Sequence, residues 1–284
     1  MSPEGPPPRM SGAAREPLTL ELQRVPRERV DMSPVTPSAL AQTSAGEVRA
    51  IELRAGNRRL RVGDLFDVSG EDTAHVAIRN GCERLTHIGG GMRFGRVSVD
   101  GDTGTHAGAA MAGGTLHIRG NAGAFAAAGM QDGVVHIRGN AGDFLGAAGA
   151  GESMGMKGGT VIVDGSVGDR SGDRMRRGMV LVGGDAADFC AARMIAGTIV
   201  VRGRAGHGAG FAMRRGTLLV ARLAALPATF ADGGPPPVVF LRLLKRHLLH
   251  AGAPLASFAE LTENVRRFVG DRACGGLGEI LVSQ

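Results

Sequence analysis

Hydrophobic and polar positions repeat along the middle of the chain at a nearly constant spacing. Seven methionines mark the repeat, at intervals of 19, 19, 26, 19, 19 and 19 residues: Met92, Met111, Met130, Met156, Met175, Met194 and Met213. A glycine stands three residues after each methionine, and aliphatic residues stand five and seven residues after it. Twelve of these fourteen aliphatic residues are β-branched. The pattern therefore predicts one short strand in every repeat.

A unit of 19 residues is too short for a pair of helices, but it holds several short strands separated by glycines. Stacking such units at about 4.8 Å gives a parallel β-solenoid. Parallel crossover connections are right-handed by default. We therefore predict an all-β, right-handed parallel β-helix of about seven 19-residue coils over residues 92–234. A left-handed hexapeptide solenoid would need internal six-residue units, which the repeat lacks.

Both faces of the later predicted strands are apolar. The slot between the two aliphatic residues holds Ser98, His117 and His136 in the early repeats. In the later repeats the same slot is apolar and holds Ile162, Leu181, Val200 and Leu219. Loss of the apolar-polar alternation indicates burial on both faces. We expect a helix over residues 238–250 or another subunit to cover this face, and we expect the methionines to fill the interior rather than to form an outer binding stripe.

The two ends of the chain have different patterns. Eight of the thirteen prolines lie in the first 37 residues, which predicts an extended N-terminal arm over residues 1–46. Residues 47–91 alternate between apolar and polar, which predicts strands that lead into the solenoid. Residues 235–284 are predicted to be a helical C-terminal extension that caps the open end.

This extension has two predicted helices. Leu241, Leu244 and Leu248 share one helical face in the first. Ser257 and Glu260 have capping-box spacing at the start of the second, which Gly270 would end.

Composition narrows the possible partners. The net charge of +6 favours nucleic acid, an anionic membrane or acidic partners. Without Trp, Tyr or a binding motif, nucleic acid is disfavoured. No stretch approaches 18 apolar residues and the first residues lack a signal-peptide pattern, so we expect a soluble, cytoplasmic protein with no membrane partner. Cys82, Cys190 and Cys274 are far apart, which excludes a disulfide framework and a cysteine-rich zinc site.

Basic residues flank the methionines of the later repeats. Stacking of the repeats would place them along one corner, which is either a solvated surface of mobile side chains or, because an unpaired row of cations repels itself, a contact surface for an anionic partner. These candidate interaction residues are Lys157, Arg174, Arg176, Arg177, Arg193, Arg214 and Arg215. The third repeat also carries seven extra residues within 145–155, a Gly/Ala-rich loop that would cradle a phosphate, enter a partner's cleft or form a flexible bulge.

The sequence predicts no catalytic or metal site in this chain. His117 and His136 occupy the same slot of adjacent repeats, but that slot supplies no third metal ligand. Asp100 and Asp164 share a slot with arginines, which favours a surface ladder of charges over an acid–base pair. No serine or cysteine stands in a nucleophile-elbow motif.

A narrower motif, G-x-x-G-x-x-x-G, recurs in register within the repeat. It stands complete at Gly101–Gly108, Gly139–Gly146, Gly165–Gly172 and Gly203–Gly210. The series resembles the GXGXG β-helix family, which includes the C-terminal domain of the glutamate synthase large subunit and the C subunit of formylmethanofuran dehydrogenase.

Flanking segments are similar to that C subunit, and the resemblance covers roughly residues 18–284. They are RVDMSP at 29–34, GNRR at 56–59, GDLF at 63–66 and GEILV at 278–282. The Arg/Ala-rich composition and the C-terminal extension resemble the bacterial formyltransferase/hydrolase complex of methylotrophs.

The resemblance implies a non-catalytic scaffold in a one-carbon formyl-transfer complex that links formyl carriers such as methanopterin to formate or CO2. It implies a formyltransferase, an amidohydrolase-like subunit and a B-type subunit as partners. It also implies a furan formyl carrier, whose acidic glutamyl tail would suit the basic residues, and metals held in the partner subunits, with no cofactor in this chain. Whether such a complex acts as an oxidoreductase on CO2 or only transfers and hydrolyses formyl stays open. The alternative is a glutamate-synthase-like spacer domain in an amidotransferase complex.

Overall fold

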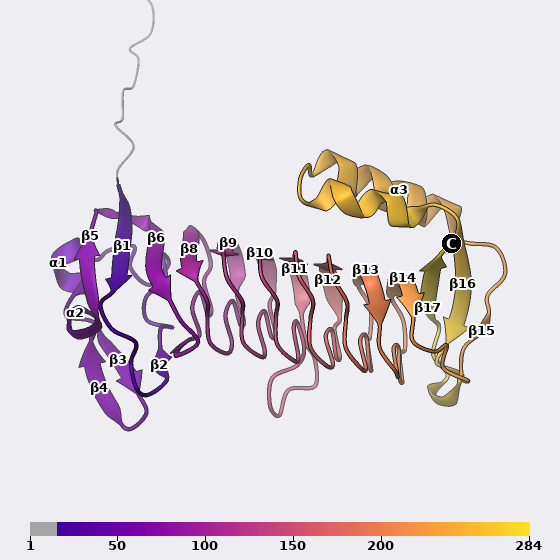
Figure 1. Ribbon diagram of the computed structural model, residues 1–284, viewed down its shortest axis with the longest axis horizontal. Coiled ribbons are helices and arrows are strands. Elements are labelled where there is room, and N and C mark those ends of the chain that lie inside the picture. The colour runs from indigo at the N-terminus through magenta and orange to yellow at the C-terminus, as the bar shows by residue number, and fades with distance from the viewer. Residues whose placement is uncertain (1–15) are drawn as a thin grey trace, which may run out of the picture.

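The fold is built mainly from strands in two sheets, and the computed structural model describes residues 16–284 (Figure 1). The larger sheet has thirteen strands in the order β15-β16-β17-β14-β13-β12-β11-β10-β9-β8-β6-β1-β5. The smaller sheet has the order β4-β3-β2-β7. The N-terminal elements are β1 (Pro17–Leu22), β2 (Val30–Asp31), α1 (Ala45–Val48), β3 (Glu52–Ala55), β4 (Arg58–Arg61), α2 (Val62–Leu65), β5 (Phe66–Ser69), β6 (Asp72–Gly81) and β7 (Leu85–Thr86).

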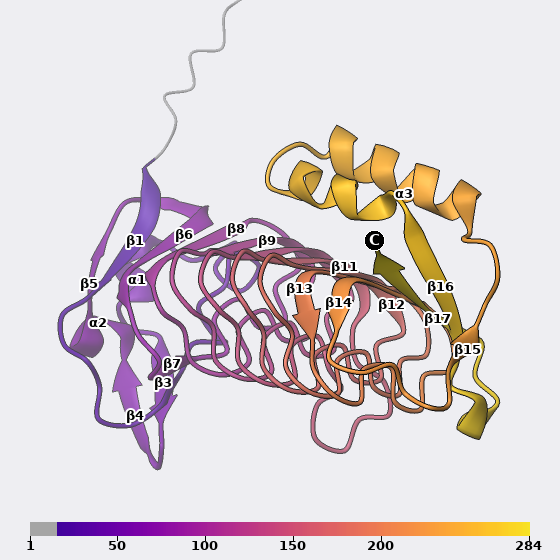
Figure 2. The ribbon, with the colours of Figure 1, turned by 45° about the vertical axis from the view of Figure 1, so that its right-hand side comes forward.

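Each methionine repeat contributes one strand to the large sheet, and each of these strands pairs in parallel with the next. The pairing joins equivalent repeat positions, as in Val161 opposite Val180 and Val180 opposite Ile199. Figure 2 shows the repeats as stacked loops of chain. The strands are β8 (Arg96–Gly101), β9 (Ala112–Ile118), β10 (Asp132–Ile137), β11 (Lys157–Val163), β12 (Arg177–Val182), β13 (Thr198–Ala205) and β14 (Thr217–Leu223). The predicted register and parallel pairing are confirmed.

The methionines fill the interior of the stack. All seven repeat methionines are fully buried, so the alternative of an outer methionine stripe is wrong. A Cβ atom built on Gly178 would lie 2.8 Å from the Cε methyl of Met156 in the preceding repeat. The same methyl-over-glycine contact recurs along the stack, as at Gly133 beside Met111 and Gly159 beside Met130. This contact explains why methionine and glycine recur together in the sequence.

Polar side chains tie successive repeats together at one corner. A side-chain oxygen in each repeat accepts a hydrogen bond from a backbone N–H one repeat later. The acceptors in this column are Asp102, Asn121, Asn140, Ser166 and Asp185. A second column runs through Asp143, Asp169 and Asp188. These bonds satisfy backbone donors at corners that the main ladder leaves free.

The prediction of an extended N-terminal arm is wrong wherever the structure describes it. Residues 1–15 lie outside the described part of the chain. Strand β1 pairs with β5 on one side and with β6 on the other, and its Leu18 and Leu20 are fully buried. Met32 and Leu40 are buried as well, so residues 17–46 belong to the folded N-terminal end. The predicted strands of residues 47–91 are present.

The C-terminal region is only partly helical. Its elements are β15 (Ala231–Asp232), α3 (Val238–His250), the 3-10 helix η1 (Leu255–Thr262), β16 (Val265–Gly270), the 3-10 helix η2 (Arg272–Cys274) and β17 (Gly278–Ser283). The predicted second helix is wrong, since a short 3-10 helix stands in its place and the Ser257 hydroxyl donates to the Pro254 carbonyl instead of capping. Strand β17 pairs with β14 and extends the stack, while β16 pairs antiparallel with β17.

Candidate functional site

The apolar face of the later strands is covered by the chain itself. Leu181, Val200 and Leu219 are fully buried, and Ile162 is nearly so. They form a second core with the inner face of α3 and with η1, and Figure 1 shows α3 lying above this part of the sheet. The side chains that cover them are Leu241, Leu244, Leu248, Phe258 and Ala259. The prediction of burial is confirmed, and it is helix 238–250 that provides the cover, so these four residues are not open to a partner.

Beside the covered face, the early strands carry a polar patch that contains three histidines. The rings of His117 and His136 lie 5.0 Å apart, and His136 Nε2 is 3.0 Å from Asp164 Oδ1. Burial, followed by the nearby His136, lowers the pKa of His117. Among residues 16–284 no group of three His, Cys, Asp or Glu side chains is placed to hold a metal ion.

A second pair in the same patch was missed by the sequence reasoning. His75 Nε2 lies 3.1 Å from Ser98 Oγ on the neighbouring strand. Burial lowers the pKa of His75, and the charge of Arg96 acts in the same direction. A serine nucleophile also needs its histidine to be oriented by a further group. In the described part of the chain, no carboxylate hydrogen-bonds to His75, so the triad geometry is incomplete.

The basic residues do gather on one side of the stack, and they meet the inserted loop there. Lys157, Arg176, Arg177, Arg214 and Arg215 are exposed. Lys157 and Arg177 are direct partners on adjacent strands, an arrangement that costs free energy when no anion is present.

Three of the predicted cations make internal contacts, and Arg176 does so only through the sulfur of Met154 in the inserted loop, 3.0 Å from its Nη1. Arg193 Nε donates to Asp173 Oδ1 at 2.8 Å, and this bond raises the pKa of the Arg193 guanidinium. Arg174 Nη1 donates to the Glu152 carbonyl at 2.9 Å, which ties the inserted loop to the ridge. A groove of about 550 Å³ separates the loop from the next repeats, and Arg174, Arg193, Arg214 and Cys274 line it. The structure thus joins two features that the sequence suggested separately.

An aromatic column was also missed, and its Phe125 and Phe144 line a hollow together with Ala148 of the inserted loop and Arg174. His87, His106, Phe125 and Phe144 stack with ring centroids 4.7, 5.1 and 4.7 Å apart. The guanidinium of Arg170 continues the column, 4.8 Å from the centroid of the Phe189 ring. From His106 on, these residues stand fourteen positions after successive repeat methionines, so the repeat contained the signal.

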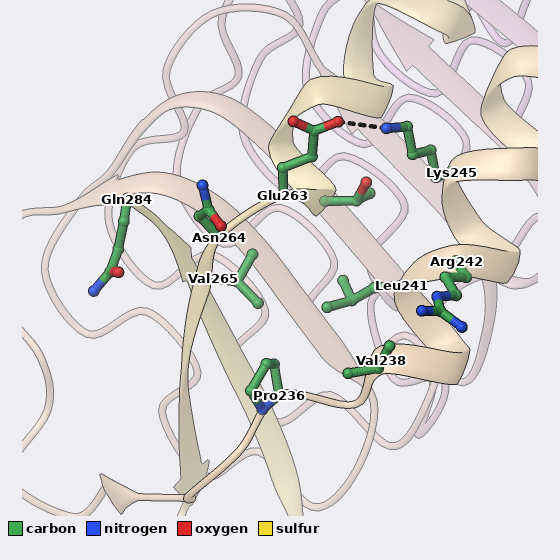
Figure 3. Close-up of a pocket in the computed structure, with 10 residues that line it drawn as sticks. Pro236, Val238, Leu241, Arg242, Lys245, Glu263, Asn264, Val265 and Gln284 are labelled. Atoms are coloured by element: carbon green, nitrogen blue, oxygen red, sulfur yellow. Dashed lines mark hydrogen bonds and ion pairs between the residues drawn. The ribbon is translucent and has the colours of Figure 1, made fainter.

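A further groove lies between α3 and strand β16 (Figure 3). It encloses about 740 Å³, and Leu241 and Val265 form its apolar floor. Glu263 and Lys245 form an ion pair across its rim, while Arg242 stands beside it without such a partner in the described residues. The groove has an apolar base with polar edges, which is typical of surfaces that hold a peptide segment.

The cysteines and the lengths of the helices are two further features of the described residues. Cys82, Cys190 and Cys274 are free thiols, and burial raises the pKa of Cys190 to about 12. Within residues 16–284, every helix is too short or too polar to cross a bilayer.

Comparison with known proteins gives consistent relatives, although no family model matches the chain. It is 42% identical over 86 residues to the C subunit of the formyltransferase/hydrolase complex Fhc of Methylorubrum extorquens, which covers 30% of this chain and 32% of that protein. It is 36% identical over 77 residues to the C subunit of the tungsten-containing formylmethanofuran dehydrogenase 2 of Methanococcus maripaludis, which covers 26% and 28%. The chain thus spans about a third of the length of the curated relatives it matches.

A solved structure matches along nearly the whole chain. It is the crystal structure of the formyltransferase/hydrolase complex (FhcABCD) from Methylorubrum extorquens in complex with methylofuran. The TM-score is 0.88 and the identity 41%, over 94% of this chain and 99% of the matched chain.

Proposed function

Because the chain belongs to the C-subunit family of formyltransferase/hydrolase and formylmethanofuran dehydrogenase complexes, we propose that it is the non-catalytic scaffold of a one-carbon formyl-transfer complex. The observation that carries the proposal is the 41% identity to a chain of the FhcABCD complex, over 99% of that chain. None of the relatives reported above is a glutamate synthase.

The interior of the molecule supports a structural role. Methionine and branched aliphatic side chains fill it, and the proposed right-handed solenoid of about seven 19-residue coils acts as a spacer. The histidine patch lacks a third metal ligand, and the His75–Ser98 pair lacks an orienting acid within the described residues. Reacting groups would therefore come from the partners.

We assign three partner subunits to the complex: a formyltransferase, an amidohydrolase-like subunit and a B-type subunit. Metals and a furan formyl carrier would reside with them, and no cofactor would be bound by this chain. The basic ridge is suited to an acidic partner surface or to the glutamyl tail of such a carrier, because guanidinium groups bind carboxylates bidentately. The three free thiols are consistent with a protein that functions in the reducing cytoplasm.

Reconstitution of the complex tests the proposal. The tagged chain is co-expressed with the other subunits, and native mass spectrometry gives the composition. We expect a stoichiometric complex, and omission of this chain should abolish it together with formyl transfer. Purification of the chain alone, while the other subunits assemble without it, would contradict the scaffold role.

A variant of the histidine patch tests the absence of catalysis. The double substitution His75→Ala and His136→Ala should leave both assembly and the rate constant of formyl transfer unchanged. A large loss of rate with intact assembly would show that this chain contributes reacting groups.

A further inference from the structure

One flank of helix α3 is a continuous groove on the outside of the molecule. Val238, Arg242, Lys245 and Leu249 follow helical spacing and so lie on one flank. The hollow of Figure 3 and a second one of about 540 Å³ both include Arg242 and Lys245 in their walls, so the two are adjacent. From Val238 to Leu249 the flank runs about 16 Å at the helical rise per residue. That length suits a short peptide segment.

The outer surface of α3 is both apolar and cationic. Val239 is 73% exposed, and Leu243 and Leu249 are each 52% exposed. None of the three packs on the sheet, which is covered by the inner face of α3. The helix contains no carboxylate, and Arg242 and Arg246 form no ion pair within residues 16–284. Exposed apolar residues mixed with unpaired cations mark an interaction surface.

We propose that this α3 groove docks an acidic, amphipathic segment of another subunit of the complex, an inference that rests on the proposed function. Apolar side chains of the segment pack against Val238 and Leu249 at the two ends. Between them, carboxylates pair with Arg242 and, in competition with Glu263, with Lys245. An arginine fork binds such a carboxylate bidentately.

The shape and charge of the groove favour a peptide over two other occupants. A second copy of this chain would bring its own cationic α3 against the first, which places like charges together. A flat lipid surface would cover the exposed polar side chains of Asn264 and Gln284 without giving them hydrogen-bond partners, whereas a peptide backbone supplies such partners. The groove therefore fits a protein segment.

Photo-cross-linking in the assembled complex tests the proposal. The photoreactive residue p-benzoylphenylalanine replaces Val238, and in a control chain it replaces Val25, which is 67% exposed between β1 and β2 near the other end of the molecule. We expect Val238 to cross-link to a segment of one partner subunit rich in Asp and Glu. Cross-links to a second copy of this chain, or none above the control, would overturn the proposal.

Charge reversal gives an independent measurement. Arg242→Glu should weaken retention of that subunit about tenfold, as for a buried interfacial charge, while Arg242→Lys should retain most of the affinity. Arg138→Glu, which makes the same charge change next to β10, should have little effect.

If the unaltered chain assembles and Arg242→Glu assembles equally well, the docking proposal is wrong and the scaffold function stands. If the unaltered chain fails to assemble, the scaffold function itself is wrong. Arg242-dependent capture of anionic vesicles in place of a subunit would show a lipid surface and also overturn the docking proposal.

Discussion

At the scale of single residues, neighbouring repeats constrain one another through contacts that allow only one residue type. Gly178 has a φ of +96°, and an added Cβ would lie 2.7 Å from the Gly159 carbonyl oxygen and 2.8 Å from the Met156 methyl. Gly129 also has positive φ, at +63°, but nothing lies within 4 Å of the Cβ position. Ala110 holds the equivalent position one repeat earlier with a φ of +54°.

These two glycines give a matched prediction. Gly178→Ala should lower the free energy of unfolding by about 2 kcal/mol or more, through backbone strain and collision with the preceding repeat. Gly129→Ala should change the free energy of unfolding by less than about 1 kcal/mol, because Ala110 adopts the same conformation at the equivalent position of the preceding repeat. Thermal unfolding followed by circular dichroism measures both. Equal effects of the two substitutions would contradict the methyl-over-glycine account of the repeat.

The aromatic column contains a histidine that a phenylalanine should replace with a gain in stability. Burial, followed by the charge of His87, lowers the pKa of His106, and its Nδ1 is buried without a hydrogen-bond partner. Phe125 and Phe144 occupy the same column at φ values of +61° and +62°, close to the +65° of His106. The backbone therefore accepts Phe at this position.

His106→Phe should raise stability by about 1 kcal/mol at neutral pH, because the unpaired nitrogen disappears. A lowered pKa in the folded state means that the unfolded chain binds the proton more tightly. Stability therefore falls as the pH drops below about 6.5, the ordinary histidine value, and the substitution should remove part of that fall. Unfolding midpoints at pH 7.5 and 5.5 measure it, with His207→Ala at an exposed histidine as the control. An unchanged pH dependence would show that His106 does not contribute.

At the scale of elements, the sequence predicts those parts of the fold in which a strand pairs with the equivalent strand of the next repeat. The positions of β8 to β14 and the burial of Leu181 and Val200 follow from comparing one repeat with the next. Strand β1 escaped prediction because its partners, β5 and β6, lie about 50 residues further along the chain. The prolines around it indicate an extended conformation, which a sheet strand and a free arm share.

The C-terminal elements show the same limit. Val265 and Phe268 have a spacing that fits a helix, but β17 offers a free edge that pairs with this segment as β16. The backbone bonds of a sheet outweighed a weak helical pattern. The α3 groove could not be predicted from the sequence either, since it forms only where residues 238–249 meet residues 263–265 and 284.

Helix α3 provides a prediction that separates its two faces. Leu248 is fully buried against the sheet, whereas its neighbour Leu249 is 52% exposed. Leu248→Ala should lower the free energy of unfolding by about 2–5 kcal/mol, as for a leucine removed from a core. Leu249→Ala should stay within about 0.5 kcal/mol of the unaltered chain. Denaturant unfolding of the two variants measures the contrast, and similar losses would mean that α3 does not pack on the sheet through its inner face alone.

At the scale of the whole molecule, the two candidate surfaces lie on different sides. Figures 1 and 2 both show α3 on one side of the stack and the inserted loop between β10 and β11 projecting from the opposite side. Arg174 bonds to this loop, so the basic ridge lies with it and away from α3. Two partners could then contact the molecule at once without competing. Two surfaces on opposite sides of one stack are what the proposed scaffold role requires.

The exposed cations of the ridge should matter for assembly and not for folding. Changing Arg176, Arg177, Arg214 and Arg215 together to Gln removes four positive charges, and it relieves the repulsion between Arg177 and Lys157 on the adjacent strand. The unfolding temperature of the variant should therefore stay level or rise. Its retention in the reconstituted complex should fall and lose its dependence on salt, because the attraction that NaCl screens over about 8–10 Å near 0.1 M is gone. Titration from 0.05 to 0.5 M NaCl, with bound carrier quantified by mass spectrometry, follows both effects. Unchanged stoichiometry and carrier content in the variant would mean that the ridge serves solubility, since an anionic partner that depends on these four guanidinium groups cannot remain bound without them.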